Sequence, residues 1–224
     1  MKENILSLAS TINALTIFEI NTLDAASWSG ANTAVSATLA PNGDTCEQWS
    51  NSGSSCKLLD IAPYIGNQFT IGCYFQPSTY QAQYGNSPPQ GVVCQIGHFG
   101  TYYVSYTALS GSGSASYPLT DLFKNNAGLT VNSPLATPIG TWRHLAIGIN
   151  LPAKTFTVFQ DGQLFDQASL NTSLTLSTMC YFGGIGDRSG IVGADASRYG
   201  YRGLISAIRL YSSYMTESFD PLTF

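Results

Sequence analysis

An Asp161-Gly162 dipeptide separates two short runs of β-prone residues, Thr155 to Gln160 and Leu164 to Ala168. Asp-Gly in this position is one of the strongest hairpin signals, because both central residues of the favoured two-residue turn need a positive φ angle. The preceding run, Trp142 to Asn150, alternates along its length. One face would carry Leu145, Ile147 and Ile149, and the other His144, Ala146 and Gly148. This part of the chain therefore predicts three consecutive antiparallel strands.

Short β-prone runs bounded by turn residues recur earlier in the chain. They are Phe69 to Phe75, which Pro77 ends, then Val92 to Ile96 and Thr101 to Thr107, with glycines between the last two. Many short strands with frequent turn signals favour a sandwich over an α/β fold. A chain of 224 residues suffices for one large sandwich. We expect an all-β fold of two antiparallel sheets.

The charge of the chain is low and unevenly spread. Charged residues make up 10% of it, against about 25% in ordinary globular domains. The stretch 61–120 has no Asp, Glu, Lys or Arg but holds eight tyrosines. Such a surface suits protein–protein burial or stacking on sugars. It suits nucleic acid poorly, because phosphate binding needs clustered Lys and Arg and the net charge here is −4.

The first thirty residues differ from the rest. We interpret residues 1–30 as an N-terminal arm or first strand, and residues 31–224 as the sandwich domain. Leu15 to Ile20 is β-prone. Polar residues interrupt the apolar run near Met1 and no cleavage site is convincing, so we expect no secretion signal. No run approaches the roughly 20 apolar residues of a membrane span. The residues with a helical spacing are Ile5, Leu8, Ile12 and Leu15.

The five cysteines are an odd number, and none belongs to a paired metal-binding motif. Cys46 and Cys56 could close a loop through a disulfide. The interpretation that we prefer is that the cysteines are free thiols, packed as small apolar residues.

Four stretches resemble motifs of one group of domains. Phe69 to Pro77 reads FTIGCYFQP, Gly140 to Ala146 reads GTWRHLA, Phe156 to Leu164 reads FTVFQDGQL, and Tyr201 to Tyr211 reads YRGLISAIRLY. In this order they resemble laminin G-like and pentraxin-like domains of the concanavalin A-like superfamily, over residues 58–219. The resemblance implies a concanavalin A-like jelly-roll sandwich. That fold hosts lectins, glycosidases, adhesion modules and viral structural proteins, so it leaves the function open.

Two packing expectations follow from residues in these motifs. Trp142 begins a strand and would plug one end of the core. Ile205 and Ile208 are three residues apart, so both can face the core only if a β-bulge lies near Ser206 and Ala207.

The carboxylates do not form a catalytic pattern. Glycosidases flank the scissile bond with two carboxylates, and on this fold these commonly lie in a Glu-x-Asp-x-x-Glu strand. Asp161 is expected to serve the geometry of its turn, and His144 to be a packed, hydrogen-bonded ring. We therefore predict that the protein is not an enzyme. Glutamate occurs only at Glu3, Glu19, Glu47 and Glu217, and none is expected in a central strand.

Calcium is a trait of the domains that the chain resembles. It needs several oxygen ligands that converge from loops. The segment Gly183 to Gly203 holds Asp187 and Asp195, without an EF-hand-like spacing. A plain flexible loop is the simpler interpretation, so we expect no cofactor and keep calcium as the alternative.

Two segments are candidate ligand- or partner-binding surfaces. Arg and Tyr side chains are typical of interface hot spots, and aromatic rings beside amides are typical of sugar sites. A solvated connector is an equal alternative for each segment. The first segment offers Arg188, Arg198, Tyr199, Tyr201 and Arg202, and the second offers Tyr80, Tyr84 and Asn86.

Together these features favour a non-enzymatic structural or decoration protein of a virion, such as a phage head or tail component. It would assemble with copies of itself as a homo-oligomer and with other virion proteins, and its laminin G-like domain would bind host-surface glycans. The alternative is an extracellular, secreted carbohydrate-binding or adhesion module. A glycoside hydrolase is less favoured.

Overall fold

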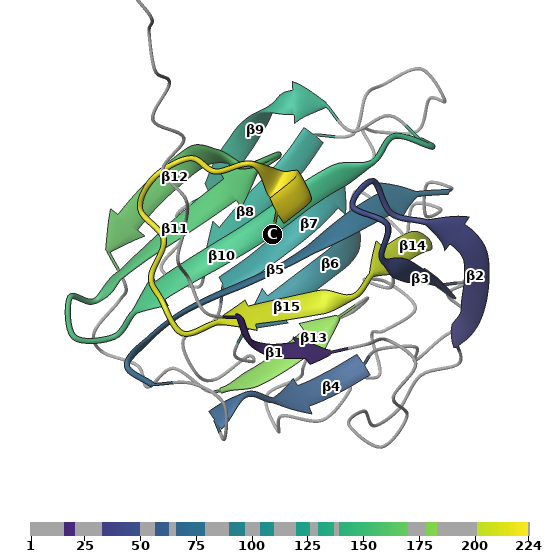
Figure 1. Cartoon of the computed structure of the whole chain (residues 1–224). Coiled ribbons are helices and arrows are strands. Elements are labelled where there is room, and N and C mark those ends of the chain that lie inside the picture. The colour runs from purple at the N-terminus through teal and green to yellow at the C-terminus, as the bar shows by residue number, and fades with distance from the viewer. Residues whose placement is uncertain are drawn as a thin grey trace, which may run out of the picture.

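The structure is a computed structural model in which two antiparallel sheets stack on each other (Figure 1). All strand pairs in the described residues are antiparallel, which confirms the predicted all-β jelly-roll sandwich. Those residues contain no helix that is long and apolar enough to cross a membrane. The structure describes residues 16–20, 33–49, 57–62, 66–78, 90–96, 104–109, 120–125, 130–136, 139–169, 178–182 and 201–223.

The larger sheet has nine strands. Seven of them follow the order β12 (Gln163–Ser169), β11 (Thr155–Gln160), β10 (Arg143–Asn150), β5 (Gln68–Pro77), β14 (Gly203–Ser206), β3 (Thr45–Trp49) and β2 (Thr33–Leu39). The other two are β15 (Ile208–Tyr211), which pairs with β5, and β1 (Thr16–Ile20), which pairs with β15. The middle of the sheet therefore joins segments that are far apart in the sequence.

The smaller sheet has six strands and packs against one face of the larger sheet. Its order is β4 (Lys57–Asp60), β13 (Met179–Phe182), β6 (Gln90–Ile96), β7 (Val104–Leu109), β8 (Thr120–Asn125) and β9 (Thr130–Ala136). A short 3₁₀ turn, η3 (Pro221–Thr223), follows the last strand.

The hairpin at Asp161-Gly162 is confirmed. Gln160 of β11 pairs with Gln163 of β12, and the two turn residues have φ angles of 50° and 75°. Asp161 has a second role, because its carboxylate accepts hydrogen bonds from the Arg143 side chain at 2.6 Å and from the His144 amide at 2.8 Å. This residue therefore ties the hairpin to the start of β10.

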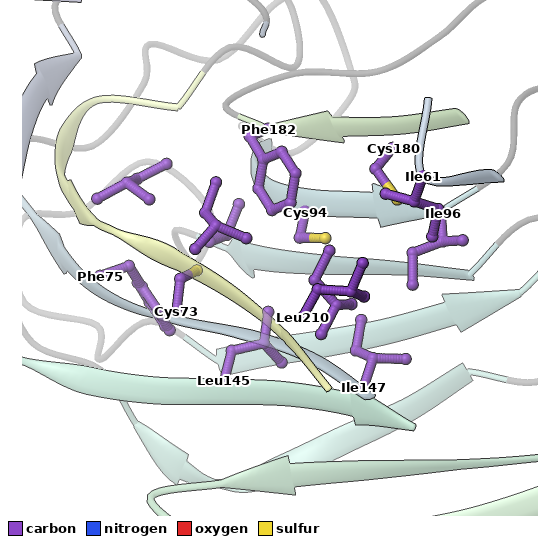
Figure 2. Close-up of a cluster of buried hydrophobic side chains, with 14 of the residues drawn as sticks. Ile61, Cys73, Phe75, Cys94, Ile96, Leu145, Ile147, Cys180, Phe182 and Leu210 are labelled. Carbon is purple, nitrogen blue, oxygen red and sulfur yellow. The ribbon is translucent and has the colours of Figure 1, made fainter. Parts of the chain in front are cut away.

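The main core lies between the two sheets. As predicted, Leu145, Ile147 and Ile149 of β10 face it, and each is at most 1% exposed. Figure 2 shows Leu145 and Ile147 on the larger sheet opposite Ile96 and Cys180 of the smaller sheet. Burial of this contiguous cluster is the dominant stabilising contribution expected for such a fold.

The predicted bulge is also confirmed. Ile205 pairs with Phe75 and Arg209 pairs with Gly72, so β14 and β15 together carry one residue more than the facing part of β5. The Ser206 hydroxyl accepts a hydrogen bond from the Tyr74 amide at 2.9 Å, where the regular ladder is interrupted. Both Ile205 and Ile208 consequently belong to the main core.

The C-terminal segment 212–223 covers part of the outer face of the larger sheet, the face turned away from the smaller sheet. In Figure 1 it crosses in front of β10, β11 and β12. The Thr70 hydroxyl donates to the Ser213 carbonyl at 2.8 Å, and the Thr157 hydroxyl donates to the Met215 carbonyl at 2.8 Å. Farther on, the Phe219 amide donates to the Gly162 carbonyl at 2.8 Å. The His144 face of β10 is therefore buried as well.

Three glycine and hydroxyl positions make room for this segment. At Gly148, a Cβ atom would meet the Thr157 and Thr70 hydroxyl oxygens and the Tyr214 ring. Beside them, Met215 and Phe219 pack into a second cluster with Phe159, Ala146 and Tyr211. The outer face thus has its own apolar cluster, separate from the main core.

The expectation for Trp142 is wrong. Its side chain packs on the outer face, edge-on against Tyr74 with ring centroids 6.5 Å apart, and not in the core. Trp142 lies two residues before His144, so alternation along the extended chain turns both side chains to the outer face. Alternation therefore outweighs the tendency of a large aromatic residue to enter the core.

Cys46, Cys73, Cys94 and Cys180 are free and buried, which agrees with the preferred interpretation of the cysteines. Since Cys46 is free, the alternative disulfide with Cys56 is not formed. Burial raises the pKa of the Cys46 thiol to about 11 and that of Cys73 to about 12. These thiols therefore stay protonated near neutral pH.

Near the N-terminus, β1 pairs with β15 of the same chain. The helical spacing between Ile5 and Leu15 falls outside the described residues, and the division of the chain at residue 30 stays a prediction.

Candidate ligand-binding site

The described residues that flank the two segments predicted to bind lie side by side at one end of the larger sheet. Gly203 of β14 pairs with Pro77 of β5 on one side and with Trp49 of β3 on the other. Just beyond, the Ser78 amide donates to the Arg202 carbonyl at 3.1 Å. We call the end of the sandwich at Pro77, Gly203 and Trp49 the loop end. In the sequence, segment 79–89 follows Ser78 and segment 183–200 precedes Tyr201.

Six of the predicted binding residues fall outside the described residues. They are Tyr80, Tyr84, Asn86, Arg188, Arg198 and Tyr199. Their binding role stays a prediction.

The structure places the other two predicted residues on opposite faces of the sheet. Tyr201 is 2% exposed in the main core, with its ring centroid 6.3 Å from that of Phe75. Its hydroxyl donates to the Leu204 carbonyl at 3.3 Å. Arg202 is partly exposed, and the alternation of the chain turns it to the outer face, as it does Leu204. Of the two, only Arg202 is placed where it can meet a ligand.

A row of side chains crosses the outer face at the loop end. Gln48 of β3, Leu204 of β14 and Gln76 of β5 are direct neighbours across the three strands. Trp142 continues the row, because the next residue, Arg143, pairs with Phe75. Leu204 is buried, whereas Gln48, Gln76 and Trp142 are partly exposed. We call these four residues the outer row.

The two amides in the outer row are held in place by the backbone. The Gln76 Nε2 donates to the Gly140 carbonyl at 2.8 Å, and the Gln48 Nε2 donates to the Gly203 carbonyl at 3.2 Å. These bonds fix the orientation of the amides, whose Oε1 atoms can accept hydrogen bonds from a ligand. Trp142 is fixed in turn by its edge contact with Tyr74. The row is therefore preorganised.

Below the row lie two buried aromatic groups that do not ionise near neutral pH. Burial, followed by the charges of Asp220, Asp161 and Asp44, raises the pKa of Tyr74 to about 12. Burial, with the nearby charge of Arg209, lowers the pKa of His144 to about 3. The His144 ring lies between those of Tyr74, at 4.8 Å, and Phe219, at 5.7 Å. The packed ring predicted for His144 is confirmed.

The nearby carboxylates have structural partners. The Asp161 carboxylate accepts a hydrogen bond from the Arg143 side chain, and the Asp44 carboxylate accepts one from the Arg209 side chain at 2.7 Å. Within the described part of the chain, no group of three or more His, Cys, Asp or Glu side chains could hold a metal ion. Asp187 and Asp195, the candidate calcium ligands, lie outside that part. What the outer row itself offers is hydrogen bonding and stacking.

Sequence reasoning missed Gln48, Gln76 and Trp142. Alternation along the strand could have located two of them. Gln76 faces the same side of the sheet as Tyr74, and Trp142 faces the same side as His144. Gln48 could not be found in this way, since its neighbours in the sheet come from the distant residues 203–206.

Comparison with known proteins supports the fold. No protein-family model matches the sequence, and no curated protein matches it. Domain 4 of AbnA, a GH43 extracellular arabinanase from Geobacillus stearothermophilus, in complex with arabinotriose, matches at 15% identity with a TM-score of 0.51, over 84% of this chain and 78% of that one. A heptameric SAP-like pentraxin from Limulus polyphemus matches at 11% identity with a TM-score of 0.51, over 79% and 80%.

The Ruminococcus gnavus IT-sialidase CBM40 matches at 13% identity with a TM-score of 0.50, over 76% of this chain and 93% of that one. These likenesses show that the chain shares a jelly-roll sandwich fold with these domains. They concern the fold.

Proposed function

We propose that this protein is a non-catalytic glycan-binding module that binds its ligand at the outer row, at the loop end of the larger sheet. The observation that carries the proposal is the row itself: two backbone-anchored amides and a half-buried tryptophan side by side on one face.

This arrangement fits the chemistry of a sugar. The apolar C–H face of a pyranose or furanose ring stacks on an aromatic ring, and Trp142 offers one that is partly exposed. The hydroxyl groups of the sugar donate to amide oxygens, which Gln48 and Gln76 supply. Because these side chains are already held in place, binding loses little conformational entropy.

The similar structures favour the same ligand class. The arabinanase domain was solved with arabinotriose, and it shares the fold of this chain. The finer assignment to laminin G-like domains rests on the four sequence motifs and belongs to this proposal.

We place the module on a virion, where it would assemble with copies of itself and with other virion proteins. The low charge and the tyrosine-rich stretch 61–120 support this setting. Repeated copies of a weak glycan site would gain apparent affinity through multivalency. Light scattering on the purified chain tests the setting: a homo-oligomer is expected, and a strict monomer would favour the secreted module instead.

A glycan array followed by calorimetry on the best ligand tests the site. Trp142→Ala is expected to weaken binding by roughly tenfold or more, because the stacking surface is lost. Leu164→Ala is the matched control, since Leu164 is 38% exposed on the edge strand β12. Equal affinities for wild type and Trp142→Ala would refute binding at the outer row. Tyr80→Ala and Tyr84→Ala test the adjoining segment in the same assay.

A further inference from the structure

Arg202 differs from the other two arginines among the described residues. Arg143 pairs with Asp161 at 2.6 Å, and Arg209 pairs with Asp44 at 2.7 Å. Arg202 has no carboxylate partner among the described residues, although its side chain is only partly exposed. Its Nε atom is buried and has no hydrogen-bond acceptor there. A buried guanidinium N–H without an acceptor is uncommon, because the group has lost its water without gaining a partner.

The backbone holds Arg202 firmly at this place. The preceding residue, Tyr201, is anchored in the core, and the Arg202 carbonyl accepts the Ser78 amide at 3.1 Å. The following residue, Gly203, has a φ angle of 147° and leaves no room for a side chain beside the Gln76 carbonyl. The backbone of Arg202 is thus fixed two residues before Leu204, at the edge of the outer row.

The outer row supplies no charge of its own, because Gln48, Leu204, Gln76 and Trp142 are all neutral. The carboxylates whose charges act on Tyr74 below the row are Asp220, Asp161 and Asp44. Asp161 and Asp44 each pair with another arginine, and Asp220 accepts the Leu222 amide. An anionic group on a ligand in the row would therefore meet in Arg202 a cation that no described carboxylate neutralises.

We propose that Arg202 is an anion-binding subsite, and that the glycan bound at the outer row is acidic. This inference rests on the proposed function and names its ligand class. The sugar ring lies against Trp142 while its anionic substituent accepts hydrogen bonds from the terminal N–H groups of Arg202. A planar carboxylate matches that fork in a bidentate way. A sulfate ester presents oxygen acceptors of the same charge sign.

The experiment compares matched oligosaccharides by calorimetry: a neutral one, its uronic acid counterpart and its sulfate ester. Wild type is expected to bind an acidic form about 10- to 100-fold more tightly than the neutral form, the range for hydrogen bonds to charged groups. Preference for the uronic acid over the sulfate identifies a carboxylate as the natural group, and the reverse identifies a sulfate.

Two substitutions of Arg202 locate the effect. Arg202→Gln should bring the ratio of acidic to neutral affinity down to about one. Arg202→Lys should retain only part of the preference, because a point charge replaces the fork. Thermal melts of both variants check that the fold is intact.

The outcomes distinguish failure of the anion subsite at Arg202 from failure of glycan binding at the outer row. Equal binding of neutral and acidic ligands by wild type, or an unchanged preference in Arg202→Gln, overturns the anion subsite alone, provided that Trp142→Ala still weakens binding. If wild type binds no glycan, neutral or acidic, the proposed function fails together with this inference.

Discussion

The outer face of the larger sheet has two parts that share the same strands but have different occupants. On β5 and β10, Thr70 and Gly148 lie under the C-terminal segment, whereas Gln76 and Trp142 lie beyond it at the loop end. Small hydroxyl and glycine positions accept the chain's own backbone, and long amides and an aromatic ring remain partly exposed. The size of the side chains along a single strand therefore decides whether the C-terminal segment covers the face or the side chains stay accessible to a ligand.

The covered part should respond most strongly to the loss of Phe219, which fills the outer cluster at 7% exposure. Phe219→Ala is expected to lower the free energy of unfolding by about 3 kcal/mol, since it removes a buried ring and leaves a cavity. Urea denaturation measures this. Leu222→Ala is the control, because Leu222 is 57% exposed and should change stability by less than about 0.5 kcal/mol. Similar losses in both variants would show that the segment does not dock as described.

Gly148→Ala disturbs the contact between the C-terminal segment and the sheet from its β10 side. The new Cβ would displace the Thr157 hydroxyl or the segment above it, so a loss of about 2 kcal/mol is expected from overpacking. Gly66→Ala provides the comparison, since a Cβ there meets nothing within 4 Å. Denaturation midpoints of the two variants should differ clearly. If they coincide, the C-terminal segment is not tightly packed on β10.

The boundary between the two parts contains His144, which gives the comparison a pH dependence. The folded protein lowers the pKa of His144 to about 3 from 6.5, so the unfolded chain binds the proton first. The stability due to this neutral ring is complete above pH 6.5 and is lost as the pH falls toward 3. The slope is at most about 1.4 kcal/mol per pH unit. Unfolding of wild type and His144→Phe between pH 7 and pH 4 measures it, and parallel curves would contradict the assignment.

A pair of substitutions on β5 gives the smallest and sharpest contrast. Thr70→Val removes the hydroxyl that contacts Ser213 and Met215, and should lower stability by about 1 kcal/mol without changing glycan affinity. Gln76→Ala should do the reverse, weakening binding several-fold while stability stays within about 0.5 kcal/mol. Calorimetry and denaturation on both variants decide. A stability loss in Gln76→Ala as large as that in Thr70→Val would erase the distinction between the two parts.

The sequence predicted local features well. The Asp161-Gly162 turn, the core-facing side of β10 and the bulge near Ser206 each follow from a rule that acts within a few residues. The predicted core position of Trp142 is wrong, because the alternation of side chains along the strand outweighs the size of its ring. The same alternation would have put it on the correct face.

The outer face could not be predicted, because its parts meet only in three dimensions. Residues 212–223 show no strand or helix pattern, and the site where they dock is assembled from Thr70, Gly148 and Thr157 on three strands. The outer row likewise joins β3, β14, β5 and the start of β10. A single sequence carries no signal for such long-range neighbours.

The order of strands has a consequence for how the chain is made. Residues 203–211 form β14 and β15, which pair with β5 on one side and with β3 or β1 on the other. They leave the ribosome after all the other strands described. Until they arrive, β12 to β5 and β3 with β2 are two separate ribbons, and one edge of β5 has no hydrogen-bonded partner strand. Completion of the larger sheet is therefore late and slow, as expected for non-local pairing, and this interval is when the nascent chain is most exposed to wrong partners.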